Sequence, residues 1–266
     1  MECKGRGKKI LWQEMWRHEL EEARKHSPVV IVPVGSIEQH GPHCPLDVDI
    51  SIPYAIATRV AEAVDDFPVL VAPPVWWGFS HYNQGFIGTI TLRLETFIEL
   101  VTDICRSIYA CGFERIILLN GHGGNQAPMI SAAMKIAEDN IFVLPITYWD
   151  MIPEELKEIS ERDGGRIGHG GELETSFQLH LRPHLVAGER ARDEPFPLPG
   201  AFRPELDAFA RFPERRRETP TGVMGTASVA TAEKGERAME AAVKKLVALV
   251  REYHASEVRD YWHRER

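Results

Sequence analysis

The sequence predicts an α/β fold in which helices cover both faces of a mostly parallel central sheet. Short runs of aliphatic and β-branched residues alternate with segments of helical periodicity, and these runs are 29–32, 69–72, 116–119 and 142–144. Runs that no polar residue interrupts are typical of strands buried on both faces. Their alternation with helices indicates crossover connections between parallel strands. We therefore expect a three-layer sandwich.

The expected strands are bounded by residues that interrupt regular structure. Pro28 and Pro33 flank the first run, and Pro73 and Pro74 follow the second. The third run leads directly into a glycine-rich turn at residues 120–125. Because ligands of open α/β sheets bind at the carboxyl ends of the strands, polar residues that follow these runs are candidate site residues.

Four segments between and after the strands are expected to be helical. In residues 95–109 apolar side chains recur at steps of three and four, and Gly112 is placed to end that helix. Residues 125–138 carry Pro128 near their start, where a helix tolerates proline. A short helix is expected over 175–181 and a long one over 233–253.

One stretch departs from this alternation. Residues 190–221 are rich in proline, arginine and glutamate, which predicts an irregular surface loop. Loops of this length inside a domain are often functional or contact other subunits. The whole chain, 266 residues, has the length of one α/β domain, so we expect a single domain over 1–266.

Charge and composition exclude some classes of function. The chain has 31 basic and 39 acidic residues, a formal net charge of −8, which argues against a nucleic-acid partner. No apolar run approaches the roughly 18–20 residues of a membrane helix, and no secretory signal is visible. The four cysteines form no CxxC pair, so free thiols are expected. These features favour a cytoplasmic protein that acts on a small molecule.

The first chemistry-bearing motif is the stretch 35–49. Glu38 and His40 are two residues apart, so in an extended backbone both side chains point to the same side. The glycine and prolines that follow can turn the chain and bring Asp49 back toward them. Two carboxylates and an imidazole are ligands that zinc or manganese binds. The alternative is a set of polar residues in a surface loop.

The second motif, NGHGGN, spans residues 120–125 between a predicted strand and a predicted helix. His122 therefore lies where the site of an α/β sheet is expected. The glycine amides could also hold an anion at the helix start. A phosphate-binding turn is the competing interpretation, but the motif lacks the Lys-Ser/Thr of a Walker sequence and the three-glycine spacing of a dinucleotide fold.

The third motif is GHGGELETS at residues 168–176. Glu174 stands at the head of a predicted helix, where it could simply complement the helix dipole. Combined with the other motifs, it gives two histidines and three carboxylates, enough for two metal ions if Asp49 bridges them. His169 would then be available to transfer a proton, because imidazole titrates near neutral pH.

A further set of residues is predicted to contact the substrate. Trp76 and Trp77 belong to an aromatic cluster that could form a pocket wall, although packing is the default for tryptophan. His81 could bind substrate or cap a loop. The full predicted set is Ser36, Trp76, Trp77, His81, Gly123, Gly124 and Asn125.

Five strings in the sequence resemble the creatininase (creatinine amidohydrolase) family. They are, in order, VPVGSIEQHGPHCPLDVD, GFIGTITL, NGHGGN, GHGGELETS and GTASVATAEKGERAME. The similarity extends from about Trp12 to about Tyr253, and the first string is highly specific. The resemblance implies an α/β sandwich around a parallel sheet, two zinc or manganese ions, and hydrolysis of C–N bonds in cyclic amides and formamides.

The resemblance also implies roles for individual residues. Glu38, Asp49 and His122 would hold one metal, while His40 and the bridging Asp49 hold the other. His169 matches a histidine implicated in proton transfer. We therefore expect two divalent ions per subunit (zinc, manganese or iron). We also expect a homo-oligomer, and the resemblance implies that it is a hexamer.

One position departs from the family pattern. True creatininases carry a glutamate two residues after the histidine of the NGH string, where this sequence has Gly124. We assign the vacant ligand position to Glu174. The sequence thus predicts a metal-dependent amidohydrolase, closer to the relatives that act on formamide pyrimidines, peptides or keto-inositols than to a true creatininase. The alternatives are hydrolysis of a keto-inositol or carbohydrate-like ring at the same metal site, and a non-catalytic small-molecule binder.

Overall fold

The computed structural model describes residues 8–196 and 219–256, and its central feature is a four-stranded parallel sheet. The strands are β1 (Val29–Val34), β2 (Val69–Val71), β3 (Arg115–Asn120) and β4 (Val143–Thr147), in the order β2-β1-β3-β4. In register, Val29 lies opposite both Val69 and Arg115. The predicted α/β class and the four predicted strands are confirmed.

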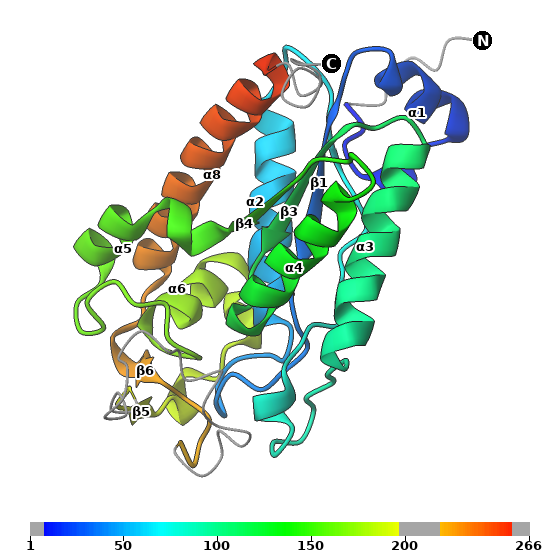
Figure 1. Ribbon diagram of the computed structural model, residues 1–266. Helices are drawn as coiled ribbons and strands as arrows, with labels where there is room; N and C mark the ends of the chain where they lie inside the picture. The colour runs from blue at the N-terminus through cyan, green and yellow to red at the C-terminus, as the bar shows by residue number, and fades with distance from the viewer. Residues whose placement is uncertain (1–7, 197–218, 257–266) are drawn as a thin grey trace.

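Helices cover both faces of this sheet, as the prediction of three layers requires (Figure 1). Because successive side chains of a strand point to opposite faces, Val29 and Ile31 enter one core while Val30 and Val32 enter the other. The first core is closed by α2 (Val48–Ala63), α5 (Pro153–Ile159), α6 (Glu172–Leu181) and α8 (Ala232–Ala255). The second is closed by α1 (Arg17–Arg24), α3 (Leu94–Ala110) and α4 (Gln126–Ala137).

Short 3-10 helices and one two-stranded antiparallel sheet complete the described chain. The 3-10 helices are η1 (Trp12–Glu14), η2 (His81–Asn83), η3 (Gly123–Asn125), η4 (Tyr148–Met151), η5 (Pro183–Leu185), η6 (Gly188–Arg190) and η8 (Ala227–Val229). Strand β5 (Asp193–Glu194) pairs antiparallel with β6 (Gly225–Thr226). The first of these strands falls within the stretch 190–221 predicted to be irregular; residues 197–218 of that stretch lie outside the described part.

Helix α2 is the largest difference from the sequence-based expectation. We expected only a turn before Asp49, whereas the chain forms a helix from Val48 to Ala63 with Pro53 inside it. The helices predicted over 95–109, 125–138 and 233–253 are present as α3, α4 and α8, and α6 begins earlier than the predicted 175.

Two expectations about the chain as a whole can be compared with the described residues. Cys44, Cys105 and Cys111 are free thiols, while Cys3 lies outside the described part. Among the described helices, none combines the length and apolar character needed to cross a bilayer.

Candidate metal centre

The carboxyl ends of the strands and the first turns of two helices bring five titratable side chains together. Glu38 and His40 lie in the loop after β1, and His122 follows β3. Asp49 is in the first turn of α2 and Glu174 in the first turn of α6. Each of the five is at most 4% exposed, although all can carry charge. Such burial is unusual for charged side chains unless they are paired or bind a metal.

Local backbone chemistry places Asp49 at this point. Pro53 has no backbone N–H, so it cannot donate the helical hydrogen bond to the carbonyl of Asp49. The backbones of Gly35 and Gly121 approach that carbonyl so closely that a Cβ on either glycine would overlap it. The first turn of α2 can therefore pack against the ends of β1 and β3 only because both positions are glycine.

The carboxylate of Asp49 faces two different histidines. Its Oδ1 lies 3.0 Å from Nε2 of His40, and its Oδ2 lies 2.8 Å from Nδ1 of His122. Each histidine also approaches a second carboxylate: Oε2 of Glu38 is 3.5 Å from His122 Nε2, the nitrogen opposite Asp49, and Oε2 of Glu174 is 3.6 Å from His40 Nε2, the same nitrogen that faces Asp49. Asp49 therefore stands between two halves of the cluster.

The candidate ligands form three overlapping groups, and within each group the ligand atoms lie within 4.8 Å of one another. They are Glu38, Asp49 and His122; His40, Asp49 and Glu174; and Glu38, His40 and His169. The first two groups share only Asp49, so they can be filled at the same time by separate ions. Mixed imidazole and carboxylate donors suit zinc, manganese or iron.

The hydrogen-bonding state of the carboxylates fits bound cations. Oε2 of Glu38 and Oδ2 of Asp49 are buried and have no hydrogen-bond partner. The 2.8 Å approach of Asp49 to His122 is therefore close in distance but lacks the geometry of a hydrogen bond. Within the described residues, no Lys or Arg forms an ion pair with Glu38, Asp49 or Glu174. Buried anionic oxygens without donors are costly, and a divalent ion would satisfy them.

Electrostatic coupling within the cluster shifts the pKa values strongly. Burial raises the pKa of Glu174 to about 7; His40 opposes this rise and the charges of Asp49 and Glu38 add to it. For His40 burial acts to lower the pKa, but the charges of Asp49 and Glu174 outweigh it and raise the pKa to about 10. The Asp49 pKa is lowered, because His40 and His122 outweigh the effect of burial. Burial and the neighbouring carboxylates both disfavour the ionised form of Glu174, and a divalent cation would favour it.

His169 completes one side of the cluster. Its backbone exchanges two hydrogen bonds with Met224, of 2.9 and 2.8 Å, which fixes the glycine-rich turn. The ring Nε2 lies 2.6 Å from the carbonyl of Gln39, and Nδ1 lies 3.5 Å from Oε1 of Glu38. The ring centroid is 4.2 Å from that of His40. His169 is thus placed either to bind a metal or to exchange a proton beside one.

The first turn of α6 is held by Glu172, which the sequence did not single out. Its carboxylate accepts hydrogen bonds from the backbone of residues 161–163, from Ser160 Oγ and from Lys234 Nζ. Burial acts to raise its pKa, but the bond from Lys234 and the backbone N–H groups lower it to about 2. This carboxylate therefore anchors the turn that presents Glu174, whose Oε2 accepts from Gly170 N at 2.6 Å.

Some of the residues predicted to contact substrate are buried and others are exposed. Ser36 is fully buried beside the cluster, and its Oγ has no hydrogen-bond partner. Asn125 ties two loops together: Oδ1 accepts from Phe79 N and Nδ2 donates to the carbonyl of Gly35, both at 2.9 Å. His81 is exposed in η2, and Gly123, Gly124 and Asn125 form η3.

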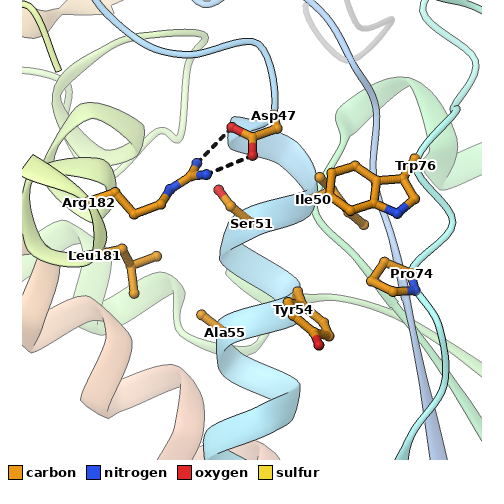
Figure 2. Close-up of a pocket in the computed structure, with 9 residues that line it drawn as sticks. All are labelled: Asp47, Ile50, Ser51, Tyr54, Ala55, Pro74, Trp76, Leu181 and Arg182. Atoms are coloured by element: carbon orange, nitrogen blue, oxygen red, sulfur yellow. Dashed lines mark hydrogen bonds and ion pairs between the residues drawn. The ribbon is translucent and has the colours of Figure 1, made fainter. Parts of the chain in front are cut away.

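The two tryptophans line cavities away from the cluster. Trp76 and Trp77 are 41% and 47% exposed. Trp76 is one wall of a cavity of about 270 Å³ beside the start of α2 (Figure 2). At its other end Arg182 donates two hydrogen bonds, of 2.7 and 2.8 Å, to the carboxylate of Asp47. This ion pair links the end of α6 to the start of α2, the helices that carry Glu174 and Asp49.

The sequence motifs did not identify two residues that contact candidate ligands. Tyr82 Oη lies 3.0 Å from Nε2 of His122, and Asn83 Nδ2 donates to Oε1 of Glu38 at 2.7 Å. Both belong to η2, a 3-10 turn between the predicted strand and helix signals. No spacing or periodicity connects them to the motifs, so only their tertiary position identifies them.

A family profile and several curated relatives match most of this chain. The profile of the creatinine amidohydrolase family, Creatininase, matches residues 13–250. Creatinine amidohydrolase of Pseudomonas putida is 33% identical over 84% of this chain and 89% of its own length. The 3-dehydro-scyllo-inosose hydrolase of Thermotoga maritima is 30% identical over 91% of this chain and 83% of its own. The mycofactocin precursor peptide peptidase of Mycobacterium tuberculosis is 34% identical over 84% and 85%.

Solved structures give the same result for the fold. A crystal structure of creatininase superposes with a TM-score of 0.81 at 29% identity, covering 94% of this chain and all of that one. A manganese form of creatininase superposes with a TM-score of 0.80 at the same identity and coverage. The chain therefore belongs to the creatininase family of metal-dependent hydrolases.

Proposed function

We propose that this protein hydrolyses a C–N amide bond of a small cyclic amide or formamide, using two divalent metal ions. The observation that carries the proposal is the position of Asp49, whose two carboxylate oxygens face His40 and His122. Each histidine has a further carboxylate beside it, so two ligand groups share one bridging residue. This is the donor arrangement of a binuclear hydrolase site.

The first ion would be held by Glu38, Asp49 and His122, and the second by His40, Asp49 and Glu174. When bound, such a pair polarises a carbonyl and lowers the pKa of a water molecule. The zinc and manganese forms of creatininase support zinc or manganese as the ions. Iron is a third candidate, because the same donors bind it.

In the proposed reaction the oxygen of water adds to the carbonyl carbon and the C–N bond then breaks. The carbon leaves as a carboxylic acid, or as formic acid from a formamide, and the nitrogen leaves as an amine after gaining a proton. One water is consumed for each bond broken. No oxidant or reductant is needed.

The proton for the leaving nitrogen is proposed to come from His169. Nε2 of His169 is held by Gln39, since it lies 2.6 Å from the backbone carbonyl and 3.0 Å from the side-chain amide nitrogen of that residue. The other ring nitrogen, Nδ1, faces Glu38 at 3.5 Å and is the atom proposed to exchange a proton with the substrate. Glu174 is the other catalytic residue of the proposal, and as a ligand of the second ion its carboxylate would be ionised and would position that ion.

Gly124 separates this site from that of a true creatininase. A Cβ at position 124 would overlap the carbonyl oxygen of Phe79 and lie 2.7 Å from Nε2 of His122. The position expected to carry a glutamate ligand in creatininases therefore has no room for a side chain here. We propose that Glu174, whose carboxylate lies 3.6 Å from His40, takes the place of that ligand, and the altered ligand set favours a substrate other than creatinine.

The named relatives give the candidate substrates. They include proteins named for creatinine, for 3-dehydro-scyllo-inosose and for a mycofactocin precursor peptide. A keto-inositol or carbohydrate-like ring opened at the same metal site is the second candidate function. Assays of metal-loaded protein with creatinine, formylaminopyrimidines, keto-inositols and short peptides distinguish them by which one is hydrolysed.

A non-catalytic small-molecule binder is the alternative from another class. The buried carboxylate oxygens of Glu38 and Asp49 that accept no hydrogen bond argue against it, because without metal only His122, among the described residues, lies beside them to offset their charge. Metal analysis and an activity screen decide between the two. A protein that binds no stoichiometric metal and turns over none of the four substrate classes would be a binder.

We further propose that the chain forms one domain and acts as a cytoplasmic homo-oligomer, with a hexamer as the assembly implied by the resemblance. The exposed apolar side chains of Trp76, Trp77, Ile87 and Ile90 support subunit contacts. Light scattering coupled to size-exclusion chromatography measures the subunit number.

A further inference from the structure

Two consecutive residues of η2 contact two different candidate ligands of the same metal group. Tyr82 is 5% exposed and Asn83 is fully buried, so both are inside the molecule. Tyr82 reaches His122 and Asn83 reaches Glu38. Those two ligands, with Asp49, form one of the three candidate groups.

Contacts on both ring nitrogens hold the ring of His122, and Nε2 is also 3.5 Å from Oε2 of Glu38. The same Nε2 lies 3.0 Å from Tyr82 Oη and 3.2 Å from the carbonyl oxygen of Phe79. Because a carbonyl only accepts, Nε2 carries a proton in this contact. The opposite nitrogen, Nδ1, then points to Oδ2 of Asp49 at 2.8 Å. The hydroxyl and the carbonyl together fix the ring's rotation.

The position of Tyr82 depends on Gly124. A Cβ at residue 124 would lie 2.8 Å from Tyr82 Oη and would overlap the carbonyl oxygen of Phe79. The loop that carries these atoms is tied down independently, since Phe79 N donates to Asn125 Oδ1 and Ser80 N donates to Thr91 Oγ1. The absence of a side chain at 124 is therefore what admits the tyrosine hydroxyl beside His122.

We propose that η2 is a positioning element for one metal ion of the proposed pair. Tyr82 orients His122 through its Nε2, and Asn83 orients Glu38 through its Oε1. Partners of this kind fix the rotation of metal-binding side chains, and their loss weakens metal affinity by about 10- to 100-fold. The inference rests on the proposed metal centre and adds that the two ions depend differently on η2: the ion at Glu38, Asp49 and His122 does, and the ion at His40, Asp49 and Glu174 does not.

The test is a Co²⁺ titration followed by visible absorption, which reports both affinity and ligand geometry. Tyr82→Phe keeps the ring and removes only the hydroxyl, and Asn83→Leu removes the amide donor at similar size. Tyr54→Phe is the matched control, because Tyr54 lines the cavity of Figure 2, which none of the candidate ligands lines. We expect Tyr82→Phe to weaken one binding phase about tenfold and alter its spectrum, and Tyr54→Phe to leave both phases unchanged.

Two variants, each without one candidate ligand, show which ion gives the binding phase that Tyr82→Phe weakens. In Glu174→Gln, the group with Glu38 and His122 remains, so adding Tyr82→Phe should weaken the remaining phase about tenfold. In His122→Ala, adding Tyr82→Phe should change nothing, because the contact no longer exists. Equal effects in both backgrounds would show a general loss of structure and would overturn the proposal.

The outcomes separate this inference from the proposed function. Wild-type protein that takes up no Co²⁺ would contradict the metal centre itself. Wild-type protein that binds Co²⁺, with the same affinity and spectrum in Tyr82→Phe and Asn83→Leu, would leave the metal centre standing and overturn the positioning role alone. Circular dichroism confirms folding; if Asn83→Leu unfolds, Asn83→Ser takes its place with the same expected loss.

Discussion

The carboxylate of Glu174 lies 3.6 Å from Nε2 of His40, although the two residues belong to separate motifs. Glu174 begins α6, and His40 is in the loop after β1. This contact brings a carboxylate from the start of α6 into the cluster, whereas a side chain at position 124 would meet His122 and Tyr82. We therefore propose Glu174 as the carboxylate ligand of the second ion.

Glu174→Gln should reduce bound metal from two equivalents to one and lower turnover at least 100-fold. The glutamine side chain carries no negative charge, and its amide oxygen is a weaker ligand for a divalent ion than a carboxylate. Metal content after dialysis and steady-state kinetics on the identified substrate measure the effect. Glu236→Gln, an exposed change on α8, is the control. Two retained equivalents in Glu174→Gln would exclude Glu174 as a ligand.

His169→Gln should lower kcat about 100-fold, leave KM little changed and keep two metal equivalents. The expectation follows from a role in proton transfer, for which effects of this size are usual. His184→Gln, an exposed substitution, is the control. Loss of one metal equivalent in His169→Gln would instead place His169 in the third ligand group, with Glu38 and His40.

The fold class and most helices could be predicted because their signals are local. Aliphatic runs identified β1 and β3, and periodic apolar residues identified α3. Two prolines inside strands prevented the sequence from predicting where β1 and β4 end. Pro33 lies within β1 but beyond its pairing with β2, and Pro145 lies in edge strand β4, where a missing donor is tolerated.

Helix α2 could not be predicted for a physical reason. Val48, Ile50 and Ile52 alternate with polar residues, which is the period of a strand, and Pro53 follows. The helix forms because this segment is buried against the sheet and other helices, so tertiary packing outweighs the local pattern. Ligand motifs were visible as strings of histidine and carboxylate residues, whereas the contacts of Tyr82 and Asn83 exist only after folding.

Gly124→Ala should lower the free energy of unfolding by about 1–3 kcal/mol, because the new methyl group would overlap the backbone carbonyl of Phe79. The same overlap displaces His122, so metal affinity should fall as well. Chemical denaturation and metal titration measure the two effects. Gly188→Ala is the matched control, since nothing lies within 4 Å of a Cβ there. Equal stability of both variants would show that position 124 has room.

Glu172→Gln should lower the free energy of unfolding by about 2 kcal/mol at pH 7, because a buried carboxylate that accepts several hydrogen bonds loses its charge. Folding lowers the pKa of Glu172 from 4.5 to about 2. Its stabilising contribution is therefore complete above about pH 4.5 and is lost as the pH falls toward 2. Urea denaturation across this range should show a steeper loss in wild type than in Glu172→Gln. Parallel curves would contradict the pKa shift.

The central claim is that Asp49 bridges two divalent ions, and metal stoichiometry tests it most directly. Elemental analysis of purified protein, dialysed after loading with zinc or manganese, should give two equivalents per chain in wild type. Asp49→Asn should retain less than one equivalent while remaining folded by circular dichroism, because both ligand groups lose their shared member. Wild-type protein with no stoichiometric metal, or Asp49→Asn that keeps two equivalents, would contradict the account.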